Sequence, residues 1–232
     1  MQNNHFPGGK GAAGTYQKII NQMKPHDIYI VGFLGGGTII RKKKPASINI
    51  AFDLDKNALD MLPDCEYSGL IELHHENFID WLENNQLTIN QSEQRILFYL
   101  DPPYLMTTRK SKKEIYRYEM SRAEHERLLN LIVGLNCDVM ISGYWSNLYE
   151  AYLSEWRVIT FLSQTRGGTP GLENLWLNFA QPLRLHDYSF LGENATQRQN
   201  IKRKAERWKN RLLHLDPREA AAIMREIDNI KD

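Results

Sequence analysis

The sequence has few of the features that mark secreted, membrane-spanning or metal-binding proteins. It contains only two cysteines, Cys65 and Cys137, whose spacing fits neither a disulfide framework nor a zinc site. No run of about 18 apolar residues is present, so we expect no membrane-spanning segment. The first residues, Met1 to Phe6, lack the basic-then-apolar pattern of a secretory signal. We therefore expect a cytoplasmic protein that holds no metal ion.

Net charge is also low, at +1, so the overall composition does not by itself indicate a polyanionic partner. The positive charges are nevertheless clustered. One cluster is Arg41–Lys44, and another comprises Arg109, Lys110, Lys112 and Lys113. The third lies in 198–211, where Glu206 is the only acidic residue. Three such clusters in a near-neutral chain favour a nucleic-acid partner.

The 232 residues, 42% of them hydrophobic, are enough for one domain with a full core and a short appendage. Apolar strand patterns alternate with helical patterns, which predicts an α/β fold with a mostly parallel sheet. The expected strands are 27–33, 47–52, 70–73, 95–100, 137–142, 156–164 and 174–179. The last two flank a glycine-rich turn and are expected to form a closing antiparallel hairpin. We place the main domain at 1–192 and a basic helical extension at 193–232.

Two features of the early strands indicate a nucleoside-containing cofactor. The first expected strand ends in the turn Phe33-Leu34-Gly35-Gly36-Gly37, where a ligand can approach a backbone without side chains. The second strand ends at Asp53, a position from which a carboxylate can bind both hydroxyls of a ribose. Ile40 stands where a dinucleotide fingerprint would have its third glycine, which weakens a nicotinamide interpretation.

Asp101-Pro102-Pro103-Tyr104 follows the fourth expected strand and indicates the chemistry. The two prolines lack N–H donors and fix the backbone, so the corner is rigid and rich in acceptors. A planar amino group could donate one hydrogen to the Asp101 carboxylate and the other to the Pro102 carbonyl. Tyr104 could lie against the face of the ring that carries this amine. The motif therefore predicts a site for an aromatic amine whose nitrogen attacks an electrophilic methyl group.

Together these motifs resemble the Dam-like adenine-specific DNA methyltransferases, in particular short phage and prophage members, over about residues 5–180. The resemblance implies a Rossmann-like class I methyltransferase fold, S-adenosylmethionine as cofactor and a bacterial or phage-infected host cell. It also implies cofactor-binding roles for Phe6, Lys10, Phe33, Gly35, Gly37, Asp53, Asn77, Phe78 and Asp101, and catalytic roles for Asp101, Pro102 and Tyr104. Lys10 belongs to the N-terminal motif His5-Phe6-Pro7-Gly8-Gly9-Lys10 and would lie near the methionine end.

The sequence departs from this family at two points. Val31-Gly32 stands before the glycine turn, where the family commonly has Glu-Pro. Only the residues 79–100 separate Phe78 from Asp101, although site-specific relatives usually insert a target-recognition subdomain there. We therefore expect relaxed sequence selectivity or a very short recognition site.

Residues outside the motifs are expected to contact the nucleic acid. Those that follow the catalytic corner or lie in later basic segments are Arg109, Lys110, Lys112, Lys113, Tyr116, Arg166, Lys202 and Arg203. The cations among them would contact phosphates, which position a protein without reading sequence. The expected partner is thus DNA, with RNA as the alternative, and the oligomeric state is not predicted.

Three competing functions remain open at this stage. An RNA methyltransferase could use the same corner on adenine or on the amino group of guanine. A non-catalytic nucleic-acid-binding module could keep the same fold, although it would have no use for the unaltered Asp101 motif. A nicotinamide oxidoreductase would give residues 101–104 no task.

Overall fold

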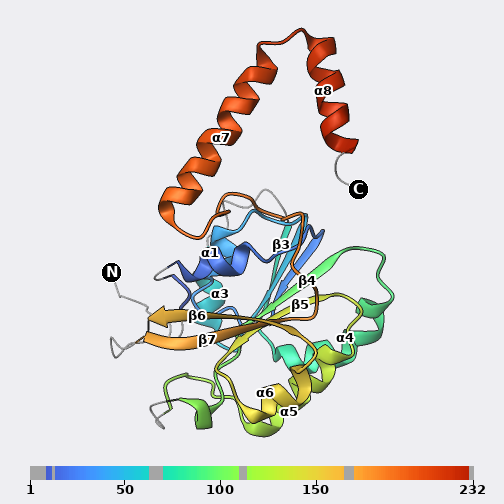
Figure 1. The fold of residues 1–232 in the computed structure, drawn as a ribbon. Coiled ribbons are helices and arrows are strands. Elements are labelled where there is room, and N and C mark those ends of the chain that lie inside the picture. The colour runs from blue at the N-terminus through green and yellow to red at the C-terminus, as the bar shows by residue number, and fades with distance from the viewer. Residues whose placement is uncertain (1–8, 12–13, 63–69, 110–113, 165–169, 230–232) are drawn as a thin grey trace. The chain divides into compact units, whose positions relative to one another are not determined.

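Seven strands form one sheet in the order β3-β2-β1-β4-β5-β7-β6 (Figure 1). The strands are β1 (Ile28–Val31), β2 (Ile48–Phe52), β3 (Leu70–His74), β4 (Ile96–Leu100), β5 (Asp138–Gly143), β6 (Arg157–Gln164) and β7 (Pro170–Leu177). Strands β1 to β5 pair in parallel, whereas β7 is antiparallel to both β5 and β6. The predicted α/β, Rossmann-like architecture with a closing antiparallel hairpin is confirmed.

The structure is a computed structural model that describes residues 9–11, 14–62, 70–109, 114–164 and 170–229. It divides into two compact units, Met1–Asp187 and Tyr188–Asp232, whereas the sequence patterns place the boundary after residue 192. The first unit contains the sheet, and the second contains the basic C-terminal segment.

Helices cover both faces of the sheet. They are α1 (Thr15–Ile20), α2 (Thr38–Lys42), α3 (Lys56–Asp60), α4 (Phe78–Asn90), α5 (Arg122–Val133) and α6 (Asn147–Leu153), with a short 3₁₀ turn η1 (Met106–Thr108). In Figure 1, α4, α5 and α6 lie on one side and α1 and α3 on the other. All five side chains of β4 are buried, because a central parallel strand has both faces covered.

Local sequence explains where several helices begin. Helix α5 starts at a capping box, in which Ser121 and Glu124 exchange side-chain and backbone hydrogen bonds. The Asn77 side chain accepts hydrogen bonds from Ile79 N and Asp80 N at the start of α4. Helix α2 has only five residues, too few to show a helical period in the sequence.

The closing hairpin is longer on one strand than the sequence indicates. Strand β7 begins at Pro170 rather than at 174, and Pro170 pairs with Gln164. Glycine and proline in 170–171 are typical of turns, so the pattern placed them in the connection. This extension brings the inner side chains of β7 further along the carboxyl end of the sheet.

The second unit is helical, as its polar and basic pattern predicts. Helix α7 (Ala195–Leu213) begins at Asn194, whose side chain accepts from Gln197 N. Helix α8 (Pro217–Asn229) follows Asp216, whose side chain accepts from Arg218 N. Lys202 and Arg203 are both exposed on α7, where they are accessible to a polyanion.

Candidate active site

The glycine turn after β1 is held open by the acid at the end of β2. Gly35 and Gly37 have φ angles of 49° and 63°, in the left-handed region that favours glycine. Gly35 N donates to Asp53 Oδ2 at 2.8 Å, and Asp55 N donates to Asp53 Oδ1 at 2.7 Å. Burial raises the pKa of the Asp53 carboxyl. Two segments that lie apart in the sequence are therefore fixed together by a single carboxylate.

A cavity of about 600 Å³ lies at this edge of the sheet, within the size range of small-molecule sites. Its lining includes Lys10, Phe33, Gly35, Gly36, Gly37, Asp53, Asn77, Asp101 and Tyr116. A Cβ atom built on Gly35 would meet no atom within 4 Å, so the backbone there faces open space. The glycine turn, the ribose-type acid and Asp101 thus share one cavity.

The buried Lys10 and the partly buried Asp101 form an ion pair in this cavity. Lys10 Nζ lies 2.8 Å from each carboxylate oxygen of Asp101 and donates to Tyr104 Oη at 2.7 Å. Burial would lower the Lys10 pKa, but Asp101 and Glu173 outweigh it and leave that pKa raised. Burial also raises the pKa of Asp101, against the opposing effect of Lys10.

Tyr104 is closed in by its neighbours. Its side chain is 4% exposed, its hydroxyl is bonded to Lys10, and its ring meets the Tyr144 ring edge-on with centroids 4.7 Å apart. Burial raises the pKa of Tyr104 well above its ordinary value. A base could stack on this ring only if Tyr144 or another neighbour moved aside, so the stacking role stays a prediction. Pro102 lies between Asp101 and Tyr104 and is buried.

Glu173 of β7 is a residue of this site that sequence reasoning missed. Its carboxylate is buried, with Oε2 3.5 Å from Lys10 Nζ and Oε1 accepting from Ser163 Oγ at 2.7 Å. The signal was a glutamate within a mostly apolar strand. Placing 170–173 in a turn concealed this, since an acid in a turn is ordinary.

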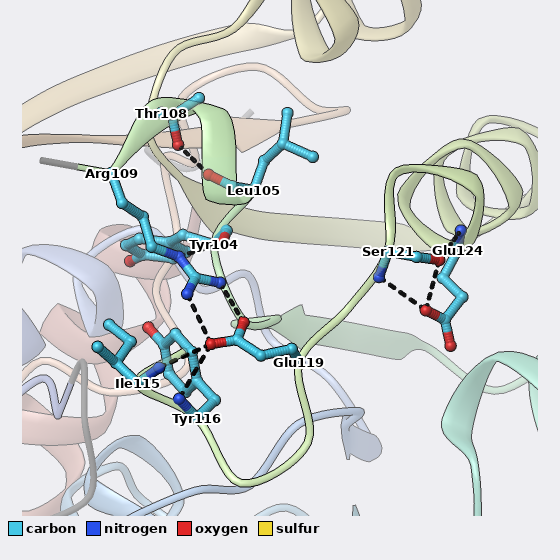
Figure 2. Close-up of polar contacts among 9 residues, drawn as sticks. All are labelled: Tyr104, Leu105, Thr108, Arg109, Ile115, Tyr116, Glu119, Ser121 and Glu124. Carbon is cyan, nitrogen blue, oxygen red and sulfur yellow. Dashed lines mark hydrogen bonds and ion pairs between the residues drawn. The ribbon is translucent and has the colours of Figure 1, made fainter. Parts of the chain in front are cut away.

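Arg109 is buried and paired within the protein, whereas its predicted contact with phosphates requires an exposed side chain. Its guanidinium is buried and makes a two-pronged ion pair with Glu119, with N–O distances of 2.8 and 2.5 Å (Figure 2). Its Nε donates to the Tyr104 carbonyl at 2.5 Å. Arg109 and Glu119 are ten residues apart in the sequence, so their ion pair joins two points of one connecting segment. An arginine at this position predicted an anionic partner, but the partner is the protein's own Glu119.

The same carboxylate positions the segment that forms one wall of the cavity. Glu119 accepts from Ile115 N and Tyr116 N, at 2.8 and 3.1 Å (Figure 2). Burial and the nearby Asp101 raise the pKa of Tyr116 to about 12. Arg117 reaches Asp55, near the ribose-type acid, at 3.0 Å. Tyr116 thus faces the cavity, while its predicted contact with a substrate base stays a prediction.

The lining of the cavity does not include Phe78, so its cofactor-binding role stays a prediction. Its ring is buried against Phe33, Phe52 and Trp81 in the core. A Cβ atom on Gly32 would come within 2.6 Å of this ring, so Gly32 allows the close packing. The preceding residue, Asn77, does line the cavity while its side chain caps α4.

Several predicted site residues lie outside the described residues. They are Phe6, Lys110, Lys112, Lys113 and Arg166. Their roles stay predictions, as does the contact of Lys202 and Arg203 with nucleic acid.

Within the described ranges, no group of three or more histidine, cysteine or acidic side chains could hold a metal ion. His74 instead stacks on Phe52 and contacts Glu76 at 2.8 Å. No helix in the described part of the chain is long and apolar enough to cross a membrane.

No protein-family model matches the sequence, and no curated protein matches it. Solved structures with a similar arrangement include a precorrin 8w decarboxylase from Methanobacterium thermoautotrophicum, with 11% identity, a TM-score of 0.48 and 78% and 96% of the two chains covered. An S-adenosylmethionine-dependent methyltransferase from Anabaena variabilis has 10% identity, a TM-score of 0.47 and coverage of 75% and 88%. An rRNA methylase from Streptococcus thermophilus has 15% identity, a TM-score of 0.43 and coverage of 70% and 93%. Similarities at this level assign neither a family nor a substrate.

Proposed function

We propose that this chain transfers a methyl group from S-adenosylmethionine to the exocyclic amino group of adenine in DNA, with relaxed or short-site selectivity. The observation that supports this most is the position of Asp101, which lines the same cavity as the glycine turn and Asp53. A strand-end carboxylate beside an open glycine backbone can hold an amine next to a nucleoside cofactor.

The cavity residues fit the cofactor. The bare backbone at Gly35 leaves room for a ligand, and Asp53 is oriented by backbone N–H groups so that its remaining lone pairs can accept from ribose hydroxyls. Lys10 and Asp101 line the same cavity. When bound, the cofactor supplies a methyl group on a sulfonium centre.

The catalytic corner then works mainly by orientation. Asp101 and the Pro102 carbonyl accept hydrogen bonds from the amino group, which leaves the nitrogen lone pair free to attack the methyl carbon. The amine nitrogen would bond to the methyl carbon as the bond between that carbon and sulfur breaks, and Asp101 would then accept one proton from the nitrogen. Correct placement of reacting groups is worth several orders of magnitude in rate. Removing the base from its stack costs a few kcal/mol in a duplex and less in a single strand.

The short interval between α4 and β4 supports relaxed selectivity. Strand β4 begins at Ile96, soon after α4 ends at Asn90, and the connection between them is too short to hold a subdomain. Phosphate contacts from exposed cations such as Lys202 and Arg203 would hold the polymer without reading its bases.

Incubation with labelled cofactor tests the proposal. The protein is mixed with methyl-labelled S-adenosylmethionine and with duplex DNA, single-stranded DNA or RNA, and the modified nucleoside is identified by mass spectrometry. We expect N6-methyladenine in DNA. Label in RNA alone would replace the substrate with RNA, and label in none of the three would favour a binding module without catalytic activity.

A further inference from the structure

Glu173 is a buried acid with an unfilled acceptor. Its side chain is 6% exposed, and in the described part of the chain Oε2 has no hydrogen-bond partner. Its other oxygen is fixed by Ser163 Oγ, and Ser163 stands on the neighbouring strand β6, where it pairs with Gly171. A carboxylate oxygen without a hydrogen bond is costly inside a protein, so its position calls for a physical explanation.

Among the described residues, Lys10 is the cation that contacts Glu173, and Asp101 holds it at present. Nζ lies 2.8 Å from both Asp101 oxygens but 3.5 Å from Glu173 Oε2. The Lys10 ammonium is therefore already bound to the Asp101 carboxylate, which the proposed reaction needs as an acceptor for the substrate amine. Two donors, Lys10 and the amine, compete for the same oxygens of Asp101.

We propose that Glu173 is a positioning residue that takes up the Lys10 ammonium when a substrate amine engages Asp101. Nζ moves from one carboxylate to the other, closing the 3.5 Å gap to hydrogen-bond distance, and one Asp101 oxygen becomes free for the amine. This inference rests on the proposed function, because it assigns Glu173 a part in how the substrate is received.

The charges favour such an exchange. Lys10 lies between two carboxylates and keeps an anionic partner in either position, so no unpaired cation is created when it moves. The flexible four-carbon stem of lysine allows a shift of this size without movement of the backbone. Glu173 itself is restrained by Ser163 and serves as the fixed acceptor.

Glu173→Gln tests the inference, since glutamine keeps the volume of the side chain but lacks the charge. We expect kcat/KM for DNA to fall about tenfold or more, because one charged hydrogen bond is lost when the amine binds. The dissociation constant of S-adenosylmethionine, measured by calorimetry, should change less than about twofold. Glu150→Gln removes an exposed glutamate of α6 and should leave both quantities unchanged.

A second measurement separates this role from simple support of the fold. Because the charge of Glu173 raises the pKa of Asp101, its removal should move the acid limb of the kcat/KM profile, and the carbon-13 titration of the Asp101 carboxyl, to lower pH. Ser163→Ala leaves the charge in place and should affect kcat/KM less than Glu173→Gln does.

The outcomes distinguish this inference from the proposed function. Wild-type activity in Glu173→Gln overturns the inference and leaves the methyltransferase proposal standing. Equal losses in Glu173→Gln and Ser163→Ala, without a shift of the acid limb, also overturn it in favour of a structural role. A wild-type protein that methylates neither DNA nor RNA overturns both.

Discussion

Two largely buried clusters of titratable side chains lie at opposite ends of the strands, which we call the carboxyl and amino edges of the sheet. At the carboxyl edge, Lys10 and Asp101 carry opposite charges and line a cavity. At the amino edge, the His26 ring stacks on His186 with centroids 3.8 Å apart, and Lys43 Nζ lies 4.2 Å from the centre of the Tyr29 ring.

The two clusters respond to burial in different ways. Burial lowers the pKa of His26 to about 2 and that of Lys43 to about 7, and their mutual repulsion adds to the effect at His26. Lys10 is equally buried but keeps a raised pKa because two carboxylates surround it. Burial of charged residue types alone therefore does not mark a site. Two carboxylates around one ammonium, beside an open cavity, distinguish the carboxyl edge.

The largest expected effect is a loss of activity from a substitution at the carboxyl edge. Asp101→Ala should reduce methyl transfer at least about a hundredfold, since the amine loses its main orienting acceptor. Cofactor affinity should change little, because Asp53 and the glycine turn remain. Methyl incorporation and calorimetry measure the two quantities. Full activity in this variant would refute the assignment of the catalytic corner.

At the same edge, the pair between Arg109 and Glu119 should contribute to stability. Burial opposes ionisation of Glu119, but hydrogen bonds from Arg109 and from the backbone hold its pKa at about 2. Glu119→Ala leaves the buried guanidinium without its partner and should lower the free energy of unfolding by about 3 kcal/mol. Chemical denaturation measures this. The exposed pair of Arg122 and Glu126 provides the control, and Glu126→Ala should cost less than about 1 kcal/mol.

At the amino edge we expect a pH effect on stability with no effect on catalysis. The folded protein keeps His26 neutral, whereas the unfolded chain takes up a proton near pH 6.5. The neutral His26 therefore contributes its full stabilisation above pH 6.5. As the pH falls from 7 to 5, the free energy of unfolding decreases by about 2 kcal/mol. His26→Gln should flatten the dependence of unfolding free energy on pH in that window by this amount. An unchanged slope would show that the ring titrates freely when folded.

The smallest effect concerns charges that are not buried at all. Lys202 and Arg203 lie exposed on α7, so Lys202→Ser with Arg203→Ser should leave stability unchanged. If both contact duplex phosphates, the slope of log affinity against log salt should become shallower by about 0.9 for each. Binding to labelled duplex DNA at several salt concentrations measures this. An identical slope would exclude the two cations from the nucleic-acid interface.

The sequence by itself determined the sheet and the sites at its carboxyl edge. Strand and turn patterns depend on residues close together in the chain, and the carboxyl ends of parallel strands meet by geometry alone. The glycine turn, Asp53 and Asp101 each follow such a strand, so their positions in the chain were enough to place them in one region.

Only the tertiary structure decided which charges face solvent and which face one another. Arg109 has the residue type of a phosphate ligand, but its guanidinium pairs with Glu119. Phe78 stands at a sequence position that predicts a cofactor contact, but its ring lies in the core. Glu173 meets Lys10 across 163 residues of chain, counted from 10 to 173, because β7 runs back along β5. Strand direction and packing determine which residues form such pairs. The residues next to each partner in the sequence do not predict them.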